Sequence, residues 1–187
     1  MSTTLDLIGS FVVGGLLLLI IFTARSNLVE SSYERNMDLI AQENMATLVE
    51  MFQHDFRKMG FGVPDSVVAV QAADSTSVSF LGDLDADGSV DTVSYSVSDT
   101  SAASGTENPR DRLFLHQING QPTDGVNMGV TTFHLTYLDS SGSATAVPAQ
   151  IRSVGVSLTV ESLYPYDDWY AKAMWEGVIR PRNLDLN

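Results

Sequence analysis

The sequence predicts an α+β fold in which a long N-terminal helix packs on a mostly antiparallel β-sheet domain. Two observations carry this prediction. Apolar residues in the first 60 positions recur at steps of three and four, the period of a helix. After Gly60 the period changes to two, the period of strands. No proline interrupts residues 1–60, so one continuous helix is expected there.

Residues 1–26 are expected to form the first, apolar part of this helix. The run between Asp6 and Arg25 holds eighteen residues without a charge. As a helix it would measure about 27 Å, close to the roughly 30 Å hydrocarbon thickness of a bilayer. A cleavable signal peptide usually has a basic segment before a shorter apolar core. Because nothing basic precedes this run and helix is expected to follow it, we expect the segment to be retained.

Residues 27–60 are expected to continue the helix as an amphipathic segment. Gly60 provides a C-cap, with Arg57 and Lys58 in the last turn, and Pro64 prevents easy continuation. The predicted apolar stripe consists of Leu28, Val29, Tyr33, Met37, Ile40, Ala41, Met45, Leu48, Val49, Phe52, Phe56 and Met59.

Residues 61–187 are expected to form a β-rich globular domain, with one face of a single sheet covered by the helix stripe. Segments rich in Val, Thr and aromatic residues alternate with clusters of Gly, Asp, Ser, Asn and Pro. The predicted strands are residues 66–71, 76–81, 91–98, 112–118, 131–138 and 151–162, followed by a short strand in the C-terminal tail.

Charge and composition exclude several classes of function. The net charge is −13, from 23 acidic and 10 basic residues. Such a surface repels phosphate backbones, so nucleic acid is not an expected partner of the globular domain. The absence of cysteine excludes disulfides and thiolate sites. No nucleophile elbow, phosphate loop or zinc-protease motif is found, and we expect no enzymatic activity.

One acidic run has the spacing of a calcium loop. Asp83, Asp85 and Asp87 alternate, a glycine follows, and Asp91 can supply a further side chain. This spacing resembles the first half of an EF-hand loop, although Ser94 stands where the bidentate glutamate is expected. The run predicts a calcium site that would make the hairpin rigid. The alternative is a plain acidic turn.

Aromatic residues gather near the C-terminus, together with two adjacent aspartates, Asp167 and Asp168. An aromatic platform beside carboxylates can bind sugar or a surface, whereas aromatics elsewhere often cover a sheet or fill a subunit interface. Both interpretations stay open for Tyr164, Tyr166, Trp169 and Tyr170.

The N-terminal stretch TLDLIGSFVVGGLLLLI, residues 4–20, resembles that of type IV pilins and type II secretion pseudopilins. In that family a Thr-Leu pair precedes an acidic residue and a long apolar run. If the mature chain begins at Ser2, Asp6 falls at the family's fifth position, where aspartate replaces the usual glutamate. The segments FRKMGFG, GDLDADGSVDTVSYSV, LTYLDSSGS and RPRNLDL are similar to those of larger minor pilins and J-type pseudopilins.

The resemblance implies that Asp6 sets the axial register between subunits. A carboxylate beside a membrane span costs several kcal/mol to bury without a partner, and the N-terminal ammonium of a neighbouring subunit would be that partner. The alternative is that Asp6 only caps the helix at the membrane interface. The expected polymerising face comprises Leu7, Phe11, Val12, Gly14, Gly15, Leu18 and Phe22. The two glycines either weaken the helix locally or allow close packing.

The function implied is that of a structural subunit of a type IV pilus-like filament. The chain would wait in the inner membrane among lipids, meet the pilus assembly machinery, and then form a helical homo-oligomer at the cell surface. No cofactor is required, and calcium is optional. The alternative is a single-span membrane anchor that presents an extracellular binding domain through the aromatic residues and the acidic loop.

Overall fold

The computed structural model describes residues 2–122 and 127–184, and for residues 2, 4–7 and 122 the backbone alone. It confirms the α+β class: one long N-terminal helix is followed by antiparallel strands. The chain divides into two compact units, Met1–Met37 and Asp38–Asn187. The first is helix throughout its described part, and the second contains the hydrophobic core.

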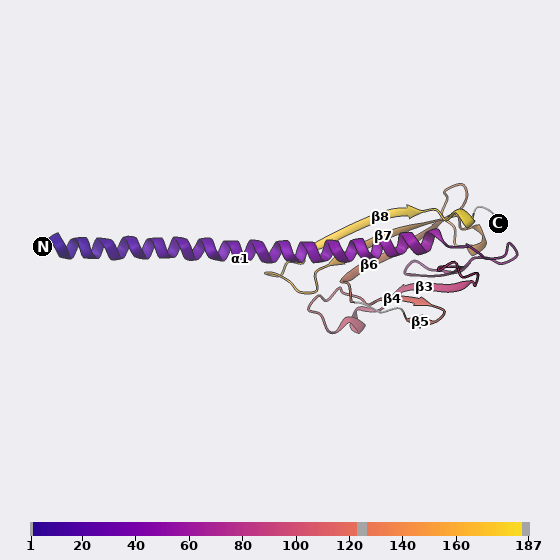
Figure 1. Cartoon of the computed structure of the whole chain (residues 1–187), viewed down its shortest axis with the longest axis horizontal. Coiled ribbons are helices and arrows are strands. Elements are labelled where there is room, and N and C mark those ends of the chain that lie inside the picture. The colour runs from indigo at the N-terminus through magenta and orange to yellow at the C-terminus, as the bar shows by residue number, and fades with distance from the viewer. Residues whose placement is uncertain (1, 123–126, 185–187) are drawn as a thin grey trace. The chain divides into compact units, whose positions relative to one another are not determined.

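Helix α1 spans Ser2–Arg57, which is 56 residues (Figure 1). The helix ends at Arg57, three residues before the predicted Gly60 cap. Gly60 has a φ of +81°, a value that glycine adopts without a steric penalty. Its N–H leaves the helical pattern and donates to the carbonyl of Leu81 at 2.8 Å. The end of the helix is therefore tied directly to a strand.

The predicted apolar stripe is buried in the second unit. Ala41, Leu48, Phe52 and Phe56 are each at most 1% exposed, and their spacing of seven, four and four residues keeps them on one face. Of the earlier stripe residues, Met37 is half-buried, and the others remain more than half exposed: Leu28, Val29, Tyr33 and Ile40. The stripe is thus buried only from Ala41 onward, although its apolar period begins thirteen residues earlier.

The strands form two sheets rather than the single sheet expected. The first sheet has the order β1-β2-β3-β4-β5 and the second the order β6-β7-β8, and every pairing is antiparallel. β5 ends the first sheet at Pro122, which has no N–H to donate to a further strand. The strands are β1 Val70–Ala73, β2 Ser77–Gly82, β3 Asp91–Val97, β4 Phe114–Ile118, β5 Gln121–Pro122, β6 Val130–Leu138, β7 Ser153–Glu161 and β8 Lys172–Ile179.

Two strands differ from the sequence-based expectation. β1 begins at Val70, so most of the alternating segment 66–71 is loop. β8 is eight residues long rather than a short terminal strand. Three short 3₁₀ helices, η1 Thr100–Ala103, η2 Pro148–Gln150 and η3 Arg182–Leu184, complete the described elements.

An aromatic cluster joins the helix to both sheets. The ring of Phe52 lies 5.4 Å from that of Phe114 in β4 and 5.4 Å from that of Phe133 in β6, measured between centroids. Phe56 contacts Phe80 and Tyr95 of the first sheet at 5.5 Å each. Figure 1 shows the last turns of α1 running alongside the strands of both sheets. The core of the second unit is therefore shared by three layers.

Candidate functional site

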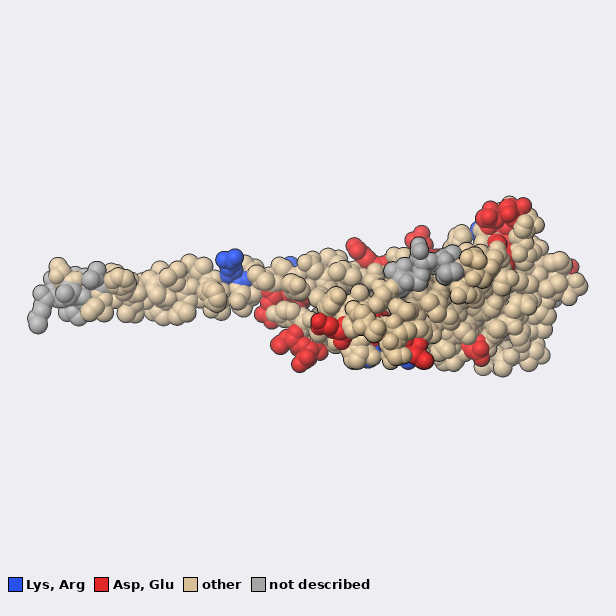
Figure 2. Space-filling view, turned by 90° about the horizontal axis from the view of Figure 1, so that it is seen from below, with Lys and Arg blue, Asp and Glu red and all other residues tan. Residues whose placement is uncertain are grey.

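The apolar part of α1 is uncovered. An 18-residue window of this helix has a mean hydropathy of 2.1, and none of that window is buried within the described structure. Phe11, Leu18 and Phe22 are 75%, 69% and 71% exposed, and Val12 is 58% exposed. Beyond the grey residues, this stretch carries neither red nor blue side chains in Figure 2. It is long and apolar enough to cross a membrane, and in water it would need another covering.

The glycine pair lies inside this uncovered stretch without interrupting the helix. α1 continues through Gly14 and Gly15. A Cβ placed on either glycine would meet no heavy atom within 4 Å. Two successive small residues flatten the helix surface locally, which suits the close approach of a second helix.

Two predicted residues, Asp6 and Leu7, fall where only the backbone is described. Both belong to α1, and their side chains lie outside the described residues. The pairing of Asp6 with a neighbouring ammonium therefore stays a prediction.

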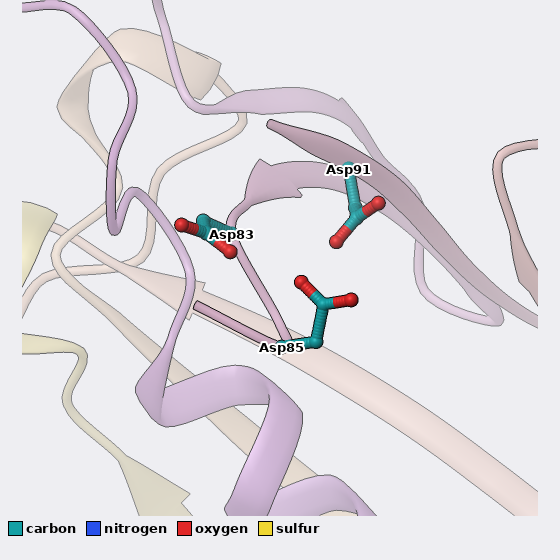
Figure 3. A group of neighbouring side chains, drawn as sticks. All are labelled: Asp83, Asp85 and Asp91. Atoms are coloured by element: carbon teal, nitrogen blue, oxygen red, sulfur yellow. The ribbon is translucent and has the colours of Figure 1, made fainter. Parts of the chain in front are cut away.

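Three of the four predicted calcium ligands come together at the turn between β2 and β3. Asp83, Asp85 and Asp91 each offer one carboxylate oxygen, and these oxygens lie within 4.8 Å of one another. Figure 3 shows the three carboxylates turned toward a common space. Asp83 is buried, Asp91 half-buried and Asp85 exposed. The fourth residue, Asp87, is outside this group, and its Oδ1 accepts a hydrogen bond from the N–H of Ser89 at 2.7 Å.

Backbone hydrogen bonds shape this acidic loop. The carboxylate of Asp83 accepts from the N–H groups of Asp87 at 3.2 Å and Gly88 at 3.0 Å. Asp91 accepts from the N–H of Leu84 at 3.1 Å and from Nδ2 of Asn119 at 2.8 Å. The Lys58 ammonium donates to the carbonyl of Leu84. These contacts hold the carboxylates in place and satisfy part of their hydrogen-bonding capacity.

The donor set fits a hard cation only in part. Carboxylate oxygen is the ligand that Ca²⁺ prefers, and a site needs six to eight oxygens at about 2.3–2.6 Å. Asp83, Asp85 and Asp91 would supply three carboxylates, so backbone carbonyls and water would have to complete the shell. Asp83, Asp85 and Asp91 are therefore the residues that would hold Ca²⁺, and the two predictions, a calcium site and a plain acidic turn, both stay open.

The four predicted aromatic residues surround a tight hairpin turn. Tyr166 and Trp169 exchange both backbone hydrogen bonds at 2.8 Å, with Asp167 and Asp168 between them. Tyr164 and Trp169 are 52% and 47% exposed. Tyr170 is fixed instead, because the Arg110 guanidinium lies 5.2 Å above its ring and its hydroxyl donates to the carbonyl of Glu107. Two of the four aromatics are thus available to a partner.

A buried acid absent from the predicted sites connects α1 to the first sheet. Asp55 is 5% exposed. Its Oδ2 accepts from the Tyr95 hydroxyl at 2.5 Å and lies 3.2 Å from Nε2 of His116, while its Oδ1 lies 2.8 Å from Nδ1 of His54. The His116 ring stacks on that of Tyr95 at 4.4 Å.

The surroundings of Asp55 favour its ionised form. Burial by itself raises the pKa of this carboxyl, but the hydrogen bonds from His116, Tyr95 and His54 outweigh burial and hold the pKa below its ordinary value. The same burial and the neighbouring Asp55 charge raise the pKa of the Tyr95 hydroxyl. The sequence did contain a signal for this cluster, since Asp55 lies seven residues after Leu48 and so shares the buried face.

Comparison with known proteins finds no matching family model, no similar curated protein and no similar solved structure. The architecture itself, one long apolar N-terminal helix followed by antiparallel sheets, is compatible with that of pilins.

Proposed function

We propose that this chain is a structural subunit of a type IV pilus-like extracellular filament. The observation that carries the proposal is the uncovered apolar stretch of α1, in which Phe11, Leu18 and Phe22 are all at least 69% exposed. A surface of this kind is stable in lipid or among other helices. A filament subunit requires both environments in turn, first the inner membrane and then the core of the filament.

Assembly would proceed through the apolar helices. In the filament, the helices of neighbouring copies bury one another's apolar side chains, and the pilus assembly machinery lifts each copy out of the membrane. The Asp6 carboxylate would pair with the N-terminal ammonium of a neighbour and so set the register. The acidic second unit, part of a chain with a net charge of −13, would form the outer surface, and no catalytic role is assigned to it.

The acidic loop has a supporting role in this proposal. Ca²⁺ held by Asp83, Asp85 and Asp91 would stiffen the β2–β3 hairpin on the filament surface. Their carboxylate oxygens lie within 4.8 Å of one another, which supports this role. The metal would have no catalytic task there.

A second candidate is a single-span membrane protein with an extracellular binding domain. The exposure of Tyr164 and Trp169 beside Asp167 and Asp168 favours it. In this case the chain would remain a monomer in the membrane, and the carboxylate at position 6 would serve only to orient the helix.

The first experiment combines negative-stain imaging of material sheared from cells with intact-mass analysis of the protein. Uniform thin filaments that contain the chain, with a processed or methylated N-terminus, are expected. Membrane-bound monomer with an unprocessed start would exclude the filament and favour the second candidate.

Substitution of Asp6 separates the two candidates further. Asp6→Ala should reduce the filament yield at least about tenfold, because an unpaired ammonium would have to be buried at each contact. Asp6→Glu keeps the charge and should retain filaments. Asp38→Ala removes an acid from a later position in α1 and is the matched control. A normal filament yield from Asp6→Ala would contradict the register role.

A further inference from the structure

The two ends of strand β8 carry opposite charge. The connection between β7 and β8 contains Asp167 and Asp168 and no basic residue, whereas Arg180 and Arg182 follow the strand. β7 and β8 are antiparallel, so this connection and these arginines lie at opposite ends of β8 (Figure 1). Eight residues at about 3.3 Å each separate the two ends by about 26 Å.

The basic end is a cavity lined by arginines. Arg57, Arg180, Arg182 and Asn183 line a space of about 400 Å³, and no carboxylate is among the described residues that line it. The chain has only ten basic residues, and three of them meet here. All three arginines are exposed. Among the described residues, neither Arg57 nor Arg182 forms an ion pair with a carboxylate.

Dipole compensation explains one arginine of the three. Arg57 is the last residue of α1, where a positive charge is favourable. Arg180 and Arg182 come from the segment after β8, away from the end of the helix in sequence. Planar guanidinium groups around one cavity suit a carboxylate, which they can bind through two parallel hydrogen bonds.

At the acidic end, the residue types of the hairpin turn are unfavourable for its backbone conformation. Asp167 and Asp168 have φ values of +49° and +64°, and the paired hydrogen bonds between Tyr166 and Trp169 define a two-residue hairpin. This geometry favours Asn-Gly. Two adjacent carboxylates at the exposed tip add repulsion to the backbone penalty. Residues held in unfavourable backbone conformations are typical of functional positions, such as sites of interaction.

We propose that the Asp167–Asp168 tip of one copy docks into the Arg57–Arg180–Arg182 cavity of a second copy. The inference rests on the proposed filament, because subunits of one polarity would present these opposite ends of β8 to one another. The contact joins two different surfaces, and a contact of this kind builds an open filament when the rotation between successive copies does not close a ring. With a net charge of −13, another copy of the chain offers many carboxylates that can enter the arginine cavity. It offers few further clusters of arginine that would compete for the Asp167–Asp168 tip. Figure 2 shows several separate patches of acidic side chains on one face of the second unit and few basic ones.

Cysteine cross-linking tests the contact directly. The chain has no cysteine, so introduced thiols are the only ones present. Two tagged full-length chains, Trp169→Cys beside the acidic tip and Asn183→Cys in the cavity lining, keep every docking charge. They are co-expressed and oxidised mildly, and the mixed dimer is measured in the sheared and membrane fractions. At least about fivefold more mixed dimer is expected than from Trp169→Cys with Glu176→Cys, because disulfides form only when the Cα atoms approach within about 7 Å. Glu176 lies midway along β8 and is exposed.

A pair of variants separates docking from folding. Asp167→Asn with Asp168→Gly should leave the melting temperature unchanged or higher, because the turn then has its favoured residues, while the filament yield falls at least about tenfold. Arg182→Gln should lower the yield similarly, whereas Lys172→Gln, an equal loss of charge at the acidic end, should not. An exchange of two charges on each side, Asp167→Arg with Asp168→Arg and Arg57→Asp with Arg182→Asp, should restore filaments.

The outcomes distinguish this contact from the filament itself. Normal filaments from the Asn-Gly variant, together with no mixed dimer, would overturn the docking and leave the proposed function intact. No filaments from the wild-type chain would overturn the proposed function. In that case a mixed dimer in the membrane fraction would still support docking, and its absence would overturn both.

Discussion

At the scale of single residues, Asp55 is the most consequential side chain of the second unit. Its carboxylate contacts Tyr95, His116 and His54, which belong to β3, β4 and α1. A buried charge of this kind contributes little net stability compared with an apolar residue, but removal of one partner is costly. Asp55 therefore fixes the position of the end of α1 on the first sheet.

The stability of the fold should depend on the ionisation of Asp55. The pKa of this carboxyl in the folded chain is below its ordinary value of 3.8. The ionised group therefore stabilises the fold above that pH, and the contribution is lost as the pH falls through the folded pKa. We expect the midpoint of urea unfolding to drop as the pH falls from about 5 toward the folded pKa.

The Asp55→Asn variant isolates this contribution. Its free energy of unfolding should be about 2–4 kcal/mol lower than that of the wild type at neutral pH. This free energy should also fall less than that of the wild type when the pH is lowered. Glu50→Gln, on the exposed face of α1, is the control and should follow the wild-type curve. An Asp55→Asn variant with the full acid dependence would contradict the assignment.

At the scale of elements, Gly129 makes the closest backbone approach in the second sheet. Its φ is +73°, and a Cβ there would lie 2.0 Å from the carbonyl oxygen of Glu161. β6 begins at the next residue, and Glu161 ends β7. The start of the β6–β7 pair thus depends on a residue without a side chain.

Gly129→Ala should lower the free energy of unfolding by about 2–4 kcal/mol, because strain in φ and a collision with backbone add together. Gly142 is the matched control: its φ is +81°, but nothing lies within 4 Å of a Cβ there. Gly142→Ala should cost only about 1 kcal/mol. Urea unfolding of both variants provides the comparison, and equal losses would exclude the collision as a cause.

The acidic β2–β3 loop should respond to calcium. Addition of millimolar CaCl₂ is expected to raise the melting temperature by about 4 °C, as for a weak site that is largely filled. Asp85→Asn should abolish the rise, while Asp65→Asn, at an exposed position outside the loop, should not. An equal rise in both variants would indicate a general salt effect on an acidic protein.

The elements were predictable where the signal is local. The end of α1 shortly before Gly60 and the apolar face of residues 41–59 follow from capping and spacing alone, whereas the exposure of the same stripe before Ala41 does not. The division into two sheets does not, because strand pairing depends on contacts distant in sequence. The strand predicted at residues 66–71 was wrong over most of its length for a related reason. A valine-rich segment forms a strand only where a partner strand is available, and β2 pairs with this region only from Val70.

The candidate sites were predictable to different degrees. Alternating aspartates at 83 and 85, with Asp91, did predict a cluster, since a hairpin turn brings such neighbours together. Asp55 and the arginine cavity were missed because their partners lie far away in the chain. Arg57 and Arg182 are 125 positions apart, and only the fold places them around one space.

At the scale of the whole molecule, the apolar and the folded parts of the chain are separable. The unit Asp38–Asn187 contains the buried core, and Phe11, Leu18 and Phe22 contribute nothing to it. A chain that begins at Ser26 should therefore stay folded and monomeric in buffer without detergent, whereas the full chain should sediment with membranes. Cell fractionation and sedimentation analysis provide the measurement, and loss of folding in the shortened chain would contradict this separation.

The position of Phe52 between Phe114 and Phe133 also has a consequence for biosynthesis. The ribosome makes α1 first, yet the rings that cover Phe52 belong to strands made much later. Until then the aromatic face of the helix has no native partner, and contacts between such distant segments form slowly. The newborn chain should therefore need a holding chaperone or early insertion of its N-terminus into the bilayer, and the time of greatest risk of aggregation is before β6 has emerged.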